Sequence, residues 1–194
     1  MPIQEPITAL TNLFLLVFSL YAFCSLIPNV KHNWPSTLFY LFFFLFTAGM
    51  SFFGALFHTN NVAFYDLQKY GTMITGGFLS ASLALAGIFD NFNKKVAILW
   101  SLLPICLTII YFATIPLNSF LPFIILQFTN IILVVFAYSR TAPNRKTSLI
   151  YAACGIFLAA GTIQTQGTQL FFLNHNDIFH LLSLLALAII FKAI

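Results

Sequence analysis

The chain has 194 residues, of which 60% are hydrophobic, only 6% are charged and 25 are phenylalanine. A soluble domain of this length has no core large enough for so many large apolar side chains. The composition therefore excludes a soluble domain and predicts an integral membrane protein.

The net charge of +4 comes from eight Lys and Arg against four Asp and Glu. The basic residues are scattered near the ends of apolar runs and form no cluster of about four to eight that would attract anionic lipid or nucleic acid. We therefore expect no nucleic-acid partner. Cys24, Cys106 and Cys154 each stand alone in an apolar run, which argues against a disulfide framework and a CxxC metal site.

The apolar runs predict an all-α fold, because a spanning helix needs about 20 mainly apolar residues whereas a membrane β-barrel shows alternating segments of about ten. We expect residues 1–194 to form one domain of seven transmembrane helices. In chain order these are Ile7–Ile27, Ser36–Phe57, Lys69–Phe89, Lys95–Ile115, Ser119–Tyr138, Thr147–Thr165 and Ile178–Ile194. No basic residue precedes the first run and no cleavage pattern follows it, so it is predicted to be a retained span and not a signal peptide.

The basic residues also predict the orientation of the chain. Seven of the eight fall after odd-numbered predicted helices, and Lys69 alone falls after an even-numbered one. Basic loops favour the cytoplasm. The C-terminus is therefore predicted to be cytoplasmic and the N-terminus to lie on the opposite side, in a multi-pass protein whose short loops suit a bacterial inner membrane.

The rare polar residues gather on the non-cytoplasmic side of this frame. His58 ends the second predicted helix, Asp66 leads into the third, and His175, Asp177 and His180 open the seventh. Helix ends often carry polar caps, and Asp177 is well placed to cap a helix N-terminus. Capping alone does not explain why three of the four His residues share one face of the membrane, so we expect a site there.

Zinc suits this set of side chains. Imidazole nitrogens together with a carboxylate or a water satisfy its tetrahedral geometry, and a bound water would have its pKa lowered to about 7. His58 and His180 are the candidate ligands from two different helices. Asp66 is a candidate for orienting or deprotonating the water, and Ser51, two turns before His58, for hydrogen-bonding it or stabilising an oxyanion.

These residues resemble the superfamily of seven-helix membrane proteins that contains the alkaline ceramidases and the adiponectin and progestin receptors. The resemblance rests on Ser51 and His58 in the second helix, Asp66 before the third, and the segment from His175 to His180. It implies a zinc ion held by three His residues and hydrolysis of a lipid amide.

Two positions depart from the pattern of that superfamily. Its second helix carries Ser-x-x-x-His, whereas Gly54 stands four residues before His58; its seventh helix carries His-x-x-x-His, whereas Asn176 stands four residues before His180. His175 can reach the metal if the helix starts after Asn176, but lies about 140° from His180 if it is itself helical. The third ligand is therefore His175 or Asp177.

The leading hypothesis is a zinc-dependent hydrolase that cleaves an amide, or an ester, of a membrane lipid such as a ceramide-like N-acyl lipid. A zinc-containing sensor or lipid-binding protein without turnover is a second hypothesis, because a drifted site can keep its metal. A haem protein with His58 and His180 as axial ligands is a third. Polar residues of the fifth and sixth helices, including Gln127, Asn130 and Gln164, either bond between helices or line a substrate cavity.

Overall fold

The computed structural model describes residues 5–31, 35–58, 65–115, 121–167, 169–170 and 172–194. These residues form seven α-helices, each long and apolar enough to cross a membrane. In chain order they are α1 (Pro6–Leu26), α2 (Ser36–His58), α3 (Tyr65–Asn91), α4 (Lys94–Thr114), α5 (Leu121–Tyr138), α6 (Arg145–Gln166) and α7 (His175–Ala193), with a 3₁₀ turn η1 (Ile27–Lys31) after α1. The predicted all-α membrane bundle is confirmed.

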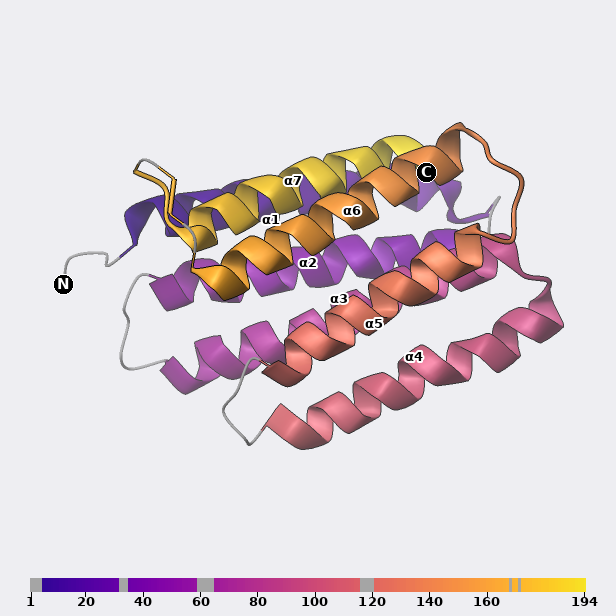
Figure 1. Cartoon of the computed structure of the whole chain (residues 1–194), viewed down its shortest axis with the longest axis horizontal. Coiled ribbons are helices and arrows are strands. Elements are labelled where there is room, and N and C mark those ends of the chain that lie inside the picture. Colours follow the sequence, from indigo (N-terminus) through magenta and orange to yellow (C-terminus); the bar gives the residue numbers. More distant parts are fainter. Residues whose placement is uncertain (1–4, 32–34, 59–64, 116–120, 168, 171) are drawn as a thin grey trace.

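The helices run side by side along the long axis of the bundle (Figure 1). α3 packs against α2, α4 and α5, while α7 packs against α1 and α6. α4 lies at one edge of the bundle, where its main neighbours are α3 and α5. Its large apolar side chains, such as Leu99 and Ile109, are mostly exposed, as expected for a helix that faces lipid.

Two helices, α3 and α7, begin about one turn earlier than their apolar runs predict. α3 starts at Tyr65, which brings Asp66 into its first turn. α7 starts at His175, because Asn174 caps the helix: its side chain accepts a hydrogen bond from the backbone N–H of Asp177, whose carboxylate in turn accepts from the backbone N–H of Asn174. This capping box satisfies donors that would otherwise be unpaired, so the helix can include polar residues. The predicted start at Ser119 lies outside the described residues.

Small residues of α3 bring α4 close. A Cβ added to Gly77 would lie 2.7 Å from a ring carbon of Phe112 and 2.8 Å from one of Tyr111. Tyr111 also donates a hydrogen bond to the backbone carbonyl of Met73. Glycine therefore admits the aromatic side chains of α4 against the α3 backbone.

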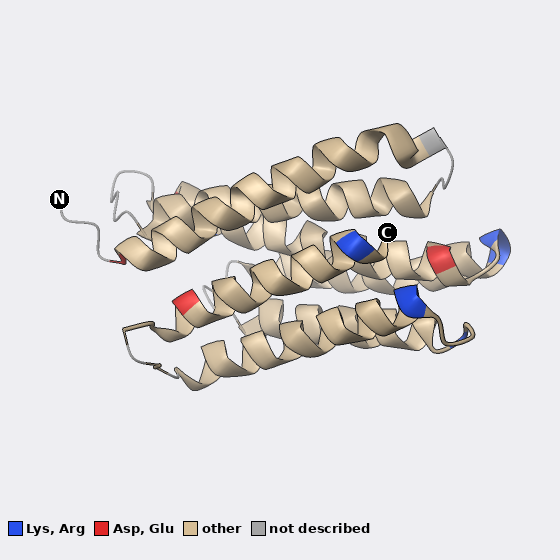
Figure 2. Cartoon of the chain, turned by 90° about the horizontal axis from the view of Figure 1, so that it is seen from above, with Lys and Arg blue, Asp and Glu red and all other residues tan. Residues whose placement is uncertain are grey.

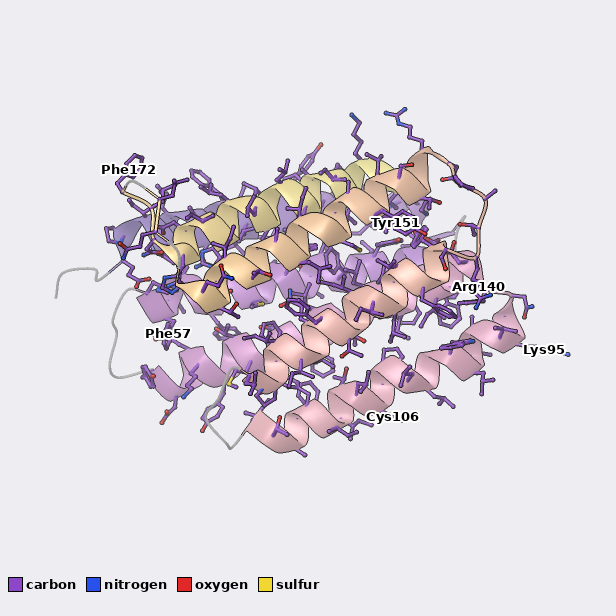
Figure 3. The ribbon with its side chains drawn as sticks, in the orientation of Figure 1. Phe57, Lys95, Cys106, Arg140, Tyr151 and Phe172 are labelled. Atoms are coloured by element: carbon purple, nitrogen blue, oxygen red, sulfur yellow. The ribbon has the colours of Figure 1, made fainter. Side chains whose placement is uncertain are left out.

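Most basic residues lie at the end of the bundle where the C-terminus lies (Figures 2 and 3), the end that carries Lys95 and Arg140. There, one oxygen of Asp90 accepts hydrogen bonds from the hydroxyls of Tyr40 (3.0 Å) and Tyr138 (2.6 Å) and pairs with the ammonium of Lys146 at 2.8 Å. We call these four residues the Asp90 cluster. It joins α2, α3, α5 and α6. A second polar cluster lies at the opposite end of the bundle.

Candidate functional site

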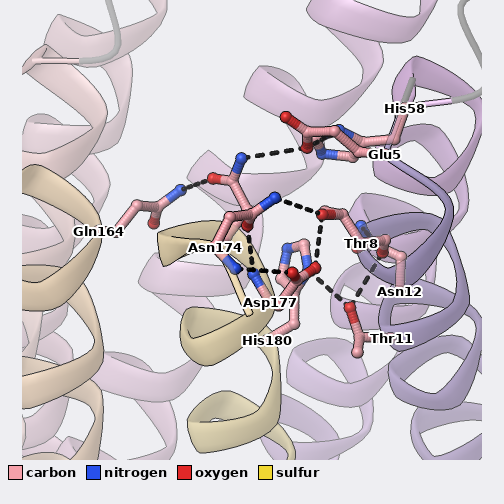
Figure 4. A network of polar contacts seen from close by, with 10 residues as sticks. Glu5, Thr8, Thr11, Asn12, His58, Gln164, Asn174, Asp177 and His180 are labelled. Carbon is pink, nitrogen blue, oxygen red and sulfur yellow. Dashed lines mark hydrogen bonds and ion pairs between the residues drawn. The ribbon is translucent and has the colours of Figure 1, made fainter. Parts of the chain in front are cut away.

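At the opposite end, His58 of α2 and His180 of α7 face each other. Their ring centroids are 6.3 Å apart. The two residues are far apart in sequence and come together because α1 packs against both α2 and α7. Figure 4 shows that the polar side chains around them come from α1, α2, α6 and α7.

One nitrogen of each ring is held by a residue of the N-terminal segment. Nδ1 of His58 lies 2.9 Å from a carboxylate oxygen of Glu5, and Nδ1 of His180 lies 3.2 Å from the hydroxyl oxygen of Thr11. Thr11 donates its own hydrogen to the backbone carbonyl of Thr8, so it accepts from Nδ1–H of His180, and the Nε2 of that ring is left as an acceptor. No hydrogen bond to either Nε2 is found in the described part of the chain.

Asp177 holds α7 against α1. It is only 2% exposed; one carboxylate oxygen accepts from the hydroxyl of Thr8 at 2.6 Å, and the other accepts from the backbone N–H of Asn174 at 2.9 Å. Buried carboxylates need such partners, because an unpaired buried charge is costly. The capping role considered for Asp177 in the sequence is thus observed.

Asn176 connects two helices to the N-terminal segment. Its amide nitrogen donates to the carboxylate of Glu5 at 3.3 Å, and its amide oxygen accepts from Gln164 of α6 at 3.4 Å (Figure 4). The residue that stands where the resemblance implies a His therefore fixes Glu5, the partner of His58.

A cavity of about 420 Å³ opens beside the two His residues. Six helices line it, and α4 does not. Its wall is mainly apolar and includes Met50, Phe57, Phe123, Phe128 and Phe179. The cavity is partly open to the surroundings. Its polar lining includes His58, His180, Asn176, Gln164 and the cationic side chain of Lys69.

A second, smaller cavity of about 60 Å³ lies next to the first and shares His180, Asn12 and Gln127 with its lining. It reaches deeper into the bundle, to Ser183 of α7 and Asn130 of α5. Gln127 thus lines a cavity, and Asn130 both lines one and donates a hydrogen bond to Ser80 of α3 at 2.9 Å. Of the two roles weighed for these residues, bonding between helices is observed for Asn130, while both residues line a cavity whose ligand is not shown.

The structure brings together only part of the predicted site. His58 and His180 adjoin, and Ser51, buried at 4% exposure, lines the smaller cavity with His180. His175 is the first residue of α7 and lines the larger cavity; as a helical residue five positions before His180 it lies about 140° around the helix. Asp66 is exposed in the first turn of α3 and lines neither cavity.

Two of these His residues suit zinc, but a third ligand is not in place. A ligating His usually gives its second nitrogen to a carboxylate or another acceptor, as His58 and His180 do here. Both oxygens of Asp177 are occupied by Thr8 and Asn174, however. Among the residues that the structure describes, no three His, Cys, Asp or Glu side chains are grouped to hold a metal. The arrangement as it stands does not fit the three protein ligands of a zinc site.

The sequence reading missed the contribution of α1 to the site. Glu5, Thr8, Thr11 and Asn12 contact the functional residues or each other, and their spacing of three to four places them on one face of the helix. A polar stripe in an otherwise apolar helix was the signal for them. Asn12 also accounts for Gly54, since a Cβ at that position would lie 3.0 Å from the amide oxygen of Asn12.

The fold and this site define a multi-pass, seven-helix membrane protein with a cavity that carries a His pair at one end of the bundle. The chain belongs to DUF6962, a family of unknown function, whose model matches residues 7–194. No match was found among curated proteins or among solved structures.

Proposed function

We propose that the protein binds a membrane-derived N-acyl lipid, with the polar head group at His58 and His180 and the acyl chain along the phenylalanine-lined wall. The observation that carries this proposal is the cavity of about 420 Å³, which falls in the usual range of about 300–1,000 Å³ for small-molecule sites. Such sites are mostly apolar with a few fixed polar groups, and this cavity has that composition.

The chemistry of the lining supports an amide head group. The Nε2 of His180 is an acceptor and takes a hydrogen bond from an N–H or O–H group. Lys69, whose ammonium lies 5.9 Å from the centroid of the Tyr65 ring, lines the same cavity and carries N–H groups of the kind that a carbonyl oxygen accepts from. An N-acyl lipid carries both the donor and the carbonyl on neighbouring atoms, whereas a methyl ester carries the carbonyl alone.

Binding of radiolabelled N-hexadecanoylethanolamine to the protein in lipid nanodiscs tests this proposal. We expect saturable binding that weakens about 10-fold or more in His58→Ala and His180→Ala, because hydrogen bonds to buried polar groups are lost. His175→Ala is the matched control, since the same side chain is removed from the same cavity away from the pair, and should change affinity less than 3-fold. Absence of saturable binding, or equal losses in all three variants, contradicts the proposal.

Hydrolysis of the bound lipid is a second candidate function, favoured by the contact between Glu5 and His58. A carboxylate that holds Nδ1–H orients the ring and leaves Nε2 to act as a general base. His58 would take a proton from a water whose oxygen attacks the acyl carbon; the C–N bond breaks, and His58 returns the proton to the leaving amine. The products are a fatty acid and ethanolamine.

Release of hexadecanoic acid from the same lipid tests this second candidate. Turnover that falls at least 100-fold in Glu5→Gln and His58→Ala supports it, because general-base catalysis contributes about 10²–10⁴-fold. No fatty acid above the protein-free blank contradicts it and leaves binding without turnover.

The zinc dependence implied by the resemblance is a separate proposal. It requires His175 or Asp177 to move onto the His pair. Zinc at one equivalent per chain, lost in the double variant of His58 and His180, supports it. Protein stripped by a chelator that releases fatty acid at the same rate contradicts it.

The proposed topology places this site on the non-cytoplasmic face of the membrane, here taken as a bacterial inner membrane. The gathering of basic residues at the opposite end supports it (Figure 2). A fluorescent protein fused after Ile194 should fold and fluoresce in the bacterial cytoplasm. An alkaline phosphatase fusion that is active at the same position would reverse the orientation.

A further inference from the structure

The smaller cavity contains two polar atoms with unmet hydrogen-bonding capacity. Among the described residues, three buried side-chain oxygen atoms have no hydrogen-bond partner: Oγ of Ser19, Oδ1 of Asn130 and Oγ of Ser183. Asn130 is 2% exposed and Ser183 is 6% exposed. Both line the cavity of about 60 Å³, whereas Ser19 lines neither cavity.

Buried polar groups without partners are costly, by about 1–3 kcal/mol each, and native proteins rarely keep them without a bound group to satisfy them. Two such atoms in the lining of one cavity call for a bound group there, either a water or part of a ligand, that supplies their hydrogen bonds. Asn130 Oδ1 is an acceptor only, so the partner must carry a donor hydrogen. Ser183 Oγ both accepts and donates.

The size and surroundings of the cavity limit what this partner can be. A volume of about 60 Å³ holds a few water-sized groups, since one water needs at least about 10–15 Å³ of such volume. An acyl chain or a full head group is too large. Within the described part of the chain, no Asp, Glu, Lys or Arg lines the cavity, so a neutral group is favoured over an ion.

The cavity also lies close to the His pair. Ser183 is three residues after His180, one turn deeper in α7 and about 4.5 Å along the helix axis. A ligand whose head group lies at His180 would therefore reach Ser183 with a substituent a few bonds from that head group.

We propose that the smaller cavity is a subsite for a hydroxyl group, and that the ligand is an N-acyl lipid bearing a hydroxyl within a few carbons of its amide. The hydroxyl donates its hydrogen to Asn130 Oδ1 and accepts a hydrogen bond from the Ser183 hydroxyl. The acyl chain follows the larger cavity. This inference rests on the proposed function, because it takes the position of the head group from it.

A matched set of lipids and variants tests the subsite. The probes are N-ethylhexadecanamide, which carries no hydroxyl group and serves as the parent, and its 2-hydroxy, 3-hydroxy and 16-hydroxy derivatives, measured by competition in nanodiscs. The wild-type protein should bind the 2-hydroxy or the 3-hydroxy lipid about 2- to 10-fold more tightly than the parent, the range of one net hydrogen bond. The 16-hydroxy lipid places its hydroxyl at the far end of the chain and should gain nothing.

Ser183→Ala should abolish this preference while the parent lipid binds as before. Ser19→Ala removes another buried serine hydroxyl without a partner, outside both cavities, and should leave the preference unchanged. Equal affinity of the wild type for all four lipids means that the cavity holds water only, and it overturns the inference. A preference that survives Ser183→Ala overturns it too. Absence of binding by every lipid instead contradicts the proposed function, so the two failures are distinguishable.

Discussion

The N-terminus of α7 depends on two side chains that bind each other's backbone. Asn174 accepts from the N–H of Asp177 at 2.9 Å, and Asp177 accepts from the N–H of Asn174 and from the hydroxyl of Thr8. The cap therefore does more than end a helix, because it also fixes α7 to α1. Since His180 and Thr11 belong to these same two helices, the cap keeps the His180 ring in register.

Replacing Asn174 with Ala should destabilise the protein by about 1–2 kcal/mol, since an N-cap side chain and its contact with α1 are lost. The measurement is chemical unfolding in a fixed detergent. Asn93→Ala is the matched control: Asn93 is an exposed N-cap of α4 whose side chain accepts from Val96 N–H, and its loss should cost about 0.5–1 kcal/mol. A larger loss for Asn93→Ala than for Asn174→Ala would show that the link to α1 contributes nothing.

The sequence alone predicted that His58 of one helix and His180 of another lie close together. His58 and His180 were placed together because both lie at helix ends on one side of the bundle. The position of His175 was not predictable, because it depends on whether α7 starts at His175 or at Ile178, and a capping box decides that start. The roles of Glu5 and Thr11 do not follow from the sequence, because their contacts with the two His residues depend on how α1 packs against α2 and α7.

At the scale of helices, the Asp90 cluster joins four elements through one carboxylate oxygen. The hydroxyl oxygens of Tyr40 and Tyr138 also lie 2.8 Å apart, so the hydrogen of Tyr40 can be shared between Asp90 and Tyr138. The cluster lies at the opposite end of the bundle from the His pair. It holds α2, α3, α5 and α6 together, all of which contribute walls to the cavity.

Asp90→Asn should lower the free energy of unfolding by about 1–3 kcal/mol, because a charged acceptor shared by two buried hydroxyls is replaced by a neutral one. Lys146→Gln is the control. It removes the cation from a half-exposed ion pair and should cost no more than about 1 kcal/mol. Equal effects of the two variants would show that the tyrosine hydrogen bonds do not carry the stability of the cluster.

Helix number followed from the composition, because seven apolar runs of spanning length leave little choice of fold. Helix ends were less predictable. The Asp66 side chain was expected near the site, but α3 already begins at Tyr65 and the carboxylate is exposed in its first turn. The roles of Tyr40 and Tyr138 were not anticipated either, since tyrosines near a membrane interface are common without any specific partner.

At the scale of the molecule, six helices enclose the two cavities and α4 takes no part in them. α4 lies on the outer edge of the bundle (Figure 1), and its exposed side chains face the membrane. Contact with α4 therefore serves as an internal control for non-specific lipid contact. Lipids that only surround the protein contact α4, whereas a specifically bound lipid contacts the cavity walls.

The central claim is that an N-acyl lipid binds in the cavity beside His58 and His180. Its most direct test is photolabelling in nanodiscs with N-hexadecanoylethanolamine carrying a diazirine close to the amide, followed by mapping of the labelled peptides. We predict label in α2 near His58 and in α7 near His180, suppressed by excess unlabelled lipid and reduced in His180→Ala. Label that is concentrated in α4, or that excess lipid does not suppress at the His pair, would contradict the account.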